Sequence, residues 1–107
     1  MGVKIGDHVG GIWKRTHADG SVSYILYESK VTRIVETRNG KKCHCRDIFR
    51  PMDVEDLESS TEIMENAKGF IIQEEPVILT PKIRSHFERW IEWANAHPGE
   101  VKSILED

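Results

Sequence analysis

Residues 30–49 read KVTRIVETRNGKKCHCRDIF, and this stretch decides the class of the fold. Two runs rich in β-branched and other strand-forming residues flank Asn39-Gly40, and this dipeptide between such runs is the strongest short-range signal for a β-hairpin. We therefore expect antiparallel strands joined there, with positive φ at both turn positions. The apolar spacing from Val31 to Val35 departs from strict alternation, which predicts a bulge or a strong bend, as in strands that curl around a small barrel.

The chain's only two cysteines, Cys43 and Cys45, belong to the second of these runs. They are too few for a disulfide framework and too close for an unstrained mutual bridge, which fits a reducing compartment. A structural zinc site would need a second pair of ligands at similar spacing, and the sequence has none. On a strand both thiols share one face and His44 takes the other, so we expect the thiols to fill a core and bind no metal.

Further strands are expected before this hairpin. Residues 3–9 and 21–28 have strand-like composition, and Asp19-Gly20 supplies a tight turn between them. Pro51 is expected to close the β-rich part, because proline cannot donate to a strand ladder.

Residues 51–79 are predicted to form an acidic connection. A short helix is expected to begin near Ser60-Thr61 and to end near Lys68-Gly69. Residues 70–79 contain two apolar clusters, which predict one extended strand or two short strands interrupted at Pro76.

The clearest helix is predicted from Thr80, an N-cap residue followed by proline at the first helical position, to about Ala96. Its apolar stripe comprises Ile83, Phe87, Trp90, Ile91, Trp93 and Ala94. Trp90 lies at the centre of the stripe and is expected in the core, whereas Trp93 lies at the edge and is expected to stay accessible. A final helical turn within residues 100–105 is expected to fold Val101, Ile104 and Leu105 back onto the sheet.

Length and composition indicate one α+β domain. The chain has 107 residues, of which 38% are hydrophobic, so we expect a single core comprising a β-rich part (1–50), the acidic connection (51–79) and C-terminal helices (80–107). No apolar run is long enough for a membrane helix, and the first residues lack the apolar stretch of a secretory signal. A cytoplasmic protein that does not bind a membrane is expected.

Charge is distributed unevenly along the chain. The net charge is -3, yet residues 30–50 carry seven Lys and Arg against two carboxylates, and residues 51–79 carry eight carboxylates against one lysine. Two interpretations fit this distribution: the protein binds two partners of opposite charge, or the basic and acidic segments attract each other within one fold.

Three segments resemble the pattern of SH3-like small β-barrels. They are Lys4-Ile5-Gly6-Asp7-His8-Val9, Lys30-Val31-Thr32-Arg33-Ile34 and Asp47-Ile48-Phe49. The sequence is also similar to uncharacterised phage and mobile-element proteins that join such a barrel to a helical appendage. The resemblance covers about residues 3–50 and implies a small antiparallel barrel, or a strongly bent sheet, whose last strand is closed by an aromatic. It assigns no functional residue.

Catalysis is not expected. The sequence shows no nucleophile beside a base, no carboxylate pair with an acid partner and no phosphate-binding loop. We therefore predict a macromolecule-binding protein that uses no cofactor.

The leading hypothesis is protein binding through Trp93 and the acidic residues Glu55, Asp56 and Glu58. With the mobile-element resemblance, this suggests an inhibitor or regulator of a nucleic-acid-processing complex, similar to an anti-CRISPR protein with an acidic surface. The same aromatic stripe would also serve a homodimer. The alternative is direct DNA or RNA binding, with Tyr24 or Tyr27 as a stacking plane beside a basic hairpin that contains Arg33, Arg38, Lys41, Lys42 and Arg46.

Overall fold

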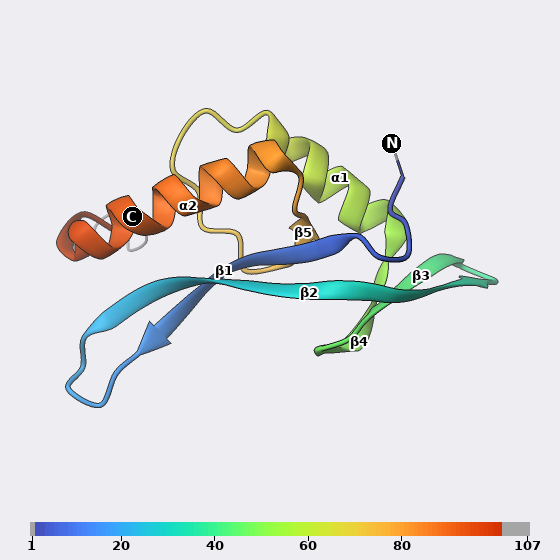
Figure 1. Ribbon diagram of the computed structural model, residues 1–107, viewed down its shortest axis with the longest axis horizontal. Helices are drawn as coiled ribbons and strands as arrows, with labels where there is room; N and C mark the ends of the chain where they lie inside the picture. Colours follow the sequence, from blue (N-terminus) through green and yellow to red (C-terminus); the bar gives the residue numbers. More distant parts are fainter. Residues whose placement is uncertain (1, 102–107) are drawn as a thin grey trace.

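The computed structural model describes residues 2–101. Its elements follow the order β1 (His8–Thr16), β2 (Val22–Thr37), β3 (Gly40–Cys45), β4 (Ile48–Asp53), α1 (Val54–Glu65), β5 (Val77–Ile78) and α2 (Pro81–Ala96). The strands form one antiparallel sheet in the order β4-β3-β2-β1-β5, with β4 and β5 as its two edges. The α+β class and the C-terminal amphipathic helix are therefore confirmed, and the sheet is not closed. Figure 1 shows both helices on the same side of the long β1–β2 ribbon.

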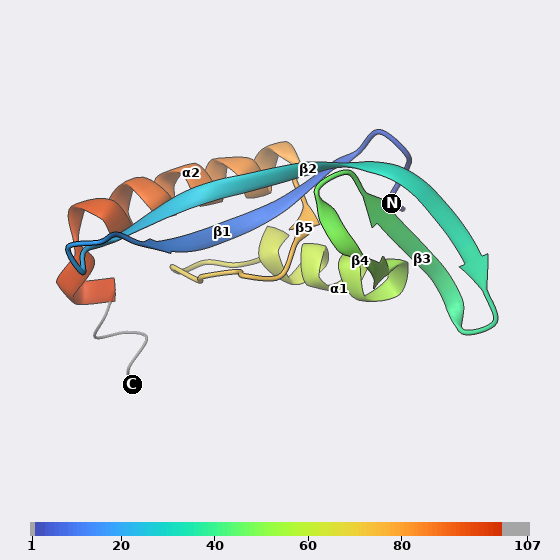
Figure 2. The same ribbon diagram turned by 90° about the horizontal axis from the view of Figure 1, so that it is seen from below.

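β2 is a single strand of 16 residues, although two shorter strands were expected in its place. Its first half pairs with β1 and its second half with β3, and the two ladders meet near His8, which pairs with Lys30. The predicted bulge is confirmed, because the register with β3 shifts between Val31 and Arg33. Figure 2 shows how β2 bends as it passes from one ladder to the other.

Both predicted turns occur, but the second differs in detail. Gly20 has φ of 88° and Gly40 has φ of 114°, whereas no residue other than glycine has positive φ among those the structure describes. The expectation of positive φ at Asn39 is therefore wrong. Thr37 pairs with Gly40, so Arg38 and Asn39 form the turn and the glycine takes the left-handed position that follows it.

The N-terminal strand begins later than expected. Residues 3–7 form a turn in which the Asp7 carboxylate accepts from the Lys4 N–H at 2.8 Å, and β1 begins at His8. Pro51 does not close the β region either, since it lies within β4. The sheet tolerates it there because β4 is an edge strand, where one missing donor leaves no gap in an inner ladder.

α1 begins at Val54, well before the predicted start at Ser60-Thr61. Thr61 lies in the middle of the helix, where its hydroxyl donates to the Leu57 carbonyl at 2.7 Å and accepts from the Ile78 N–H at 2.9 Å. The threonine therefore covers the outer edge of β5 and does not cap a helix. Residues 70–76 form no strand, so the predicted strands reduce to Val77–Ile78.

α2 agrees with its prediction, and the Thr80 hydroxyl accepts from the Ile83 N–H at 3.3 Å. The helix covers one core cluster, built on residues such as Ile12 and Phe87. A second cluster lies under the start of α1 and contains both cysteines, as predicted. Burial raises the pKa of the Cys45 thiol to about 12.

One further helical turn follows α2 at residues 98–101, and Val101 is buried as expected. Ile104 and Leu105 lie outside the described residues. Within those residues no helix is long and apolar enough to cross a membrane.

Candidate nucleic-acid interface

The second half of β2 and β3 together form a two-stranded arm, residues 33–44, here called the basic arm. Figures 1 and 2 show the tip of this hairpin extending beyond both helices. The arm contains four Lys and Arg residues and His44, against a single carboxylate, Glu36. Three of these cations, Arg33, Arg38 and Lys41, are exposed to solvent.

The arm's charge is largely unpaired. Lys42 forms an ion pair with Asp53 of β4. Within residues 2–101, Arg33, Arg38 and Lys41 take part in no ion pair. Attraction between the basic hairpin and the acidic segment thus accounts for one lysine only.

The structure does not bring all the predicted basic residues to one face. Arg33 is the cross-strand partner of His44, and Lys42 precedes His44 by two residues on β3. These three side chains point away from α1, because the alternating residue Cys43 packs in the cluster beneath that helix. Lys41 therefore takes the opposite face from Lys42.

The remaining two predicted residues lie in turns. Arg38 is at the tip of the arm, and Arg46 is in the turn between β3 and β4. The Arg46 N–H donates to the Lys30 carbonyl at 3.0 Å, which holds this turn against β2. Both side chains are exposed.

Phe49 is the functional candidate that sequence reasoning missed. The resemblance to a small barrel implied that this aromatic closes the last strand, but its side chain is 98% exposed. Ile48 packs into the cluster beneath α1 instead, and adjacent side chains of a strand point to opposite faces. The alternation of the strand already indicates that Ile48 and Phe49 face opposite sides of the sheet. The sequence does not indicate which of the two faces the core.

Neither tyrosine offers a free stacking plane. Tyr24 is buried in the core under α2, which contradicts its predicted role. Tyr27 is half-buried; its ring packs edge-on against Trp13, and its hydroxyl donates to the Glu74 carbonyl. Burial, with smaller contributions from Glu75 and Glu74, raises the pKa of Tyr27 to about 12.

The expected contrast between Trp90 and Trp93 is not observed, since both are half-buried. Trp93 packs against Phe70 with ring centroids 5.1 Å apart and stacks on His97 at the same separation. Its role in protein binding stays a prediction. Trp13, which sequence reasoning did not consider, is 61% exposed.

The acidic candidates lie on α1, which carries no lysine or arginine. Glu55 and Asp56 are exposed in the first turn, where carboxylates also stabilise the helix through its dipole. Glu58 is half-buried and accepts from the Val3 N–H at 3.5 Å. It lines an open cavity of about 670 Å³ together with Asp7, Glu62 and Glu65.

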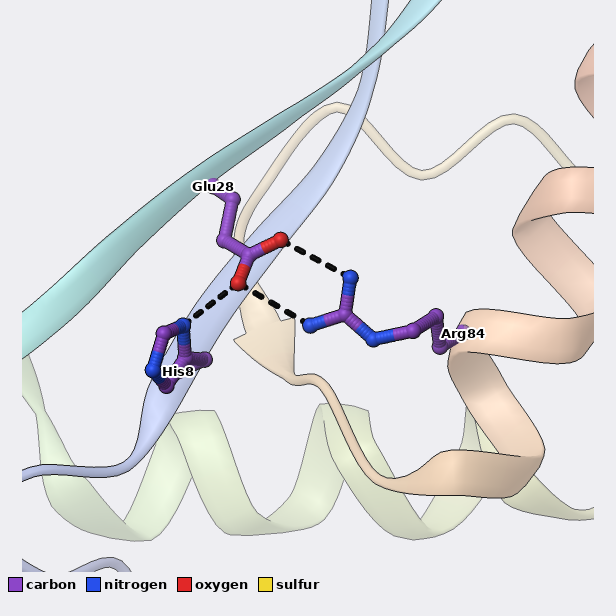
Figure 3. Close-up of polar contacts among 3 residues, drawn as sticks. All are labelled: His8, Glu28 and Arg84. Carbon is purple, nitrogen blue, oxygen red and sulfur yellow. Dashed lines mark hydrogen bonds and ion pairs between the residues drawn. The ribbon is translucent and has the colours of Figure 1, made fainter.

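His8 also lines this cavity and belongs to a polar cluster that joins β1, β2 and α2 (Figure 3). The Arg84 guanidinium donates to both carboxylate oxygens of Glu28 at 2.8 and 3.0 Å, and His8 contacts the same carboxylate. The hydrogen bonds from Arg84 are the main cause that lowers the pKa of Glu28 to about 2. Glu28 is therefore charged near neutral pH and attaches α2 to the sheet.

No group of three or more His, Cys, Asp or Glu residues in the described part of the chain is placed to hold a metal ion. Compared with protein-family models, with curated proteins and with solved structures, the chain matches none of them. What the protein does is therefore inferred from its own surfaces. The fold and the site define a small α+β protein with an open sheet and a projecting basic β-arm.

Proposed function

We propose that this protein binds nucleic acid, without catalysis, through the basic arm. The observation that supports this most directly is that Arg33, Arg38 and Lys41 form no ion pair within the described residues, although Glu36 is the cross-strand neighbour of Lys41. Arg33 points away from α1 and Arg38 lies at the tip of the arm, so neither lies against the acidic helix. These cations are free to neutralise phosphates, and release of the condensed counterions drives such binding.

The shape of the arm supports the same function. A two-stranded β-ribbon is narrow enough to enter the major groove of a duplex or to follow a sugar–phosphate backbone. The negative charge of the chain is concentrated elsewhere, mainly in residues 51–79. The net charge of -3 therefore does not prevent a local attraction between the arm and phosphates.

The test compares two triple variants that carry the same change in charge. In the arm variant Arg33, Arg38 and Lys41 become alanine, and in the control Lys14, Arg15 and Lys82 do. All six side chains are exposed, and none forms an ion pair within residues 2–101. Fluorescence anisotropy measures the affinity of each protein for a labelled oligonucleotide across a salt series.

Wild-type affinity should fall steeply as salt rises, and the control should behave like the wild type. The arm variant should bind more weakly, and the slope of log K against log salt should become shallower by roughly one for each phosphate that is no longer neutralised. Equal affinities of the arm variant and the control, or no wild-type binding at low salt, would contradict the proposal.

A second candidate function is supported by the charge of α1. Five carboxylates without a basic residue on this helix form a surface that suits a basic protein partner, as an inhibitor or regulator of a nucleic-acid-processing complex would require. The variant Glu55→Lys/Asp56→Lys/Glu58→Lys should then lose a partner that wild-type protein retains after nuclease treatment. Retention of that partner by the triple variant would exclude this surface. The relationship to SH3-like barrels and mobile-element proteins stays a prediction.

A further inference from the structure

Phe49 is more exposed than any other large hydrophobic residue in the described part of the chain. Isolated exposed apolar residues are ordinary on protein surfaces, so exposure alone indicates nothing. The surroundings of Phe49 do, because the register of the sheet places it beside the cations that point away from α1.

The pairing of β3 with β4 and β2 locates Phe49 relative to the arm. Cys45 pairs with Ile48 and Cys43 pairs with Met52, so His44 lies opposite residues 49–51. On its other side His44 pairs with Arg33 of β2. A row of two polar side chains, Arg33 and His44, therefore lies on one face of the sheet, and Phe49, which alternates with the inward-facing Ile48, projects from the same face of β4.

More positive charge flanks this row. Arg46 is exposed in the turn that leads into β4, whereas Arg50 lines a cavity that also contains Asp53, Asp56 and Glu75. The nearest carboxylates along the chain are Asp47, in the same turn, and Asp53, which is paired with Lys42. Arg33 and His44, on the same face of the sheet as the ring, can donate hydrogen bonds to phosphate.

We propose that Phe49 stacks on an unpaired base of single-stranded nucleic acid while Arg33 and His44 contact the adjoining phosphates. This inference rests on the proposed function and adds the class of ligand. In a duplex both faces of each internal base are covered by its neighbours, so stacking on an unpaired base avoids the cost of opening a base step.

The same strand is poorly suited to bind a strand of a partner protein. Pro51 has no N–H to donate, and the register of β4 is broken between its pairs with Cys45 and Cys43. Both features interrupt the row of donors and acceptors that an added strand needs. A stacked base requires no such row.

The test measures the affinity of wild type, Phe49→Ala, Phe49→Tyr and Ile63→Ala for three probes of equal length at one salt concentration. The probes are oligo(dT), oligo(U) and a blunt DNA duplex. We expect Phe49→Ala to weaken single-strand binding roughly tenfold, within the range found for loss of one base–aromatic stack, and to leave duplex affinity unchanged. Phe49→Tyr should bind like wild type, and so should Ile63→Ala, which removes an exposed apolar side chain on α1.

Unfolding does not complicate the test, because truncating a side chain that is 98% exposed should leave the melting curve unchanged. A lower affinity of Phe49→Ala for oligo(dT) or oligo(U) would support stacking. The wild-type affinities for these two probes would show whether DNA or RNA is preferred. Arm-dependent binding that Phe49→Ala leaves intact would overturn the inference and leave the proposed function standing. No binding of any probe by wild type would overturn both. The wild type could also form a dimer that Phe49→Ala dissociates without weakening single-strand binding. This result would show that the ring contacts a second copy of the chain, and it would overturn the inference.

Discussion

The side-chain amide of Asn95 occupies the place of a neighbouring strand beside Tyr24. Its oxygen accepts from the Tyr24 N–H at 2.8 Å, and its nitrogen donates to the Tyr24 carbonyl at 3.0 Å. This part of β2 has β1 on one side only, because β3 pairs with the other half of the strand. One residue of α2 thus satisfies two part-buried backbone groups that the sheet leaves without a partner.

Asn95→Ala should therefore destabilise the protein by about 2 kcal/mol, because it leaves a backbone donor and a backbone acceptor unpaired. Thermal unfolding followed by circular dichroism measures the effect. Glu92→Ala, a truncation of an exposed side chain on the same helix, should shift Tm by much less. Equal shifts for the two variants would show that the amide contributes nothing beyond its helical position.

Arg84 and Glu28 predict a dependence of stability on pH. The pKa of Glu28 is lowered from 4.5 to about 2, so the pair stabilises the fold fully above pH about 4.5 and progressively less as pH falls toward 2. Arg84→Met should reduce the free energy of unfolding in urea at pH about 6. The difference from wild type should shrink at pH about 3, whereas Lys82→Met should show no such trend. A constant difference would mean that Arg84 acts through packing alone.

Gly40 has φ of 114°, and no atom lies within 4 Å of the position a Cβ would take. Gly40→Val should therefore be costly for conformational reasons alone, by about 1–2 kcal/mol. Gly69 also has open space around it but no positive φ. Gly69→Val is thus a matched control, and a comparison of melting temperatures should place Gly40→Val several degrees lower. Equal melting temperatures would show that the turn adapts without strain.

Trp93 and Trp13 are predicted to respond differently to truncation. Trp93 is half-buried between Phe70 and His97, so Trp93→Ala should cost about 2 kcal/mol, roughly half the value for a fully buried aromatic. Trp13 is mostly exposed, and Trp13→Ala should leave the chemical-denaturation midpoint nearly unchanged. If Trp93→Ala folds with wild-type stability, its ring is available as the protein-binding residue that the sequence predicted.

Local signals were sufficient for several elements. The helix from Pro81 to Ala96 follows from an N-cap hydroxyl, a proline at the first helical position and a 3.6-residue period, all of which act within one segment. The shared face of Cys43 and Cys45 follows from the two-residue period of a strand. The bulge near Val31 was likewise visible as a break in that period. These features depend on residues that are close together in the chain, so the local amino-acid sequence specifies them.

Other features depend on contacts between distant segments, and only the tertiary structure decided them. α1 begins at Val54 although Asp53 makes no side-chain cap, because Val54 and Leu57 are buried against the β3 cysteines. The inward direction of Ile48 follows from the same cluster, and it exposes Phe49. No pattern within residues 48–49 could choose between the two faces, because a strand's alternation defines two sets of side chains and only the packing of the sheet against α1 determines which set is buried.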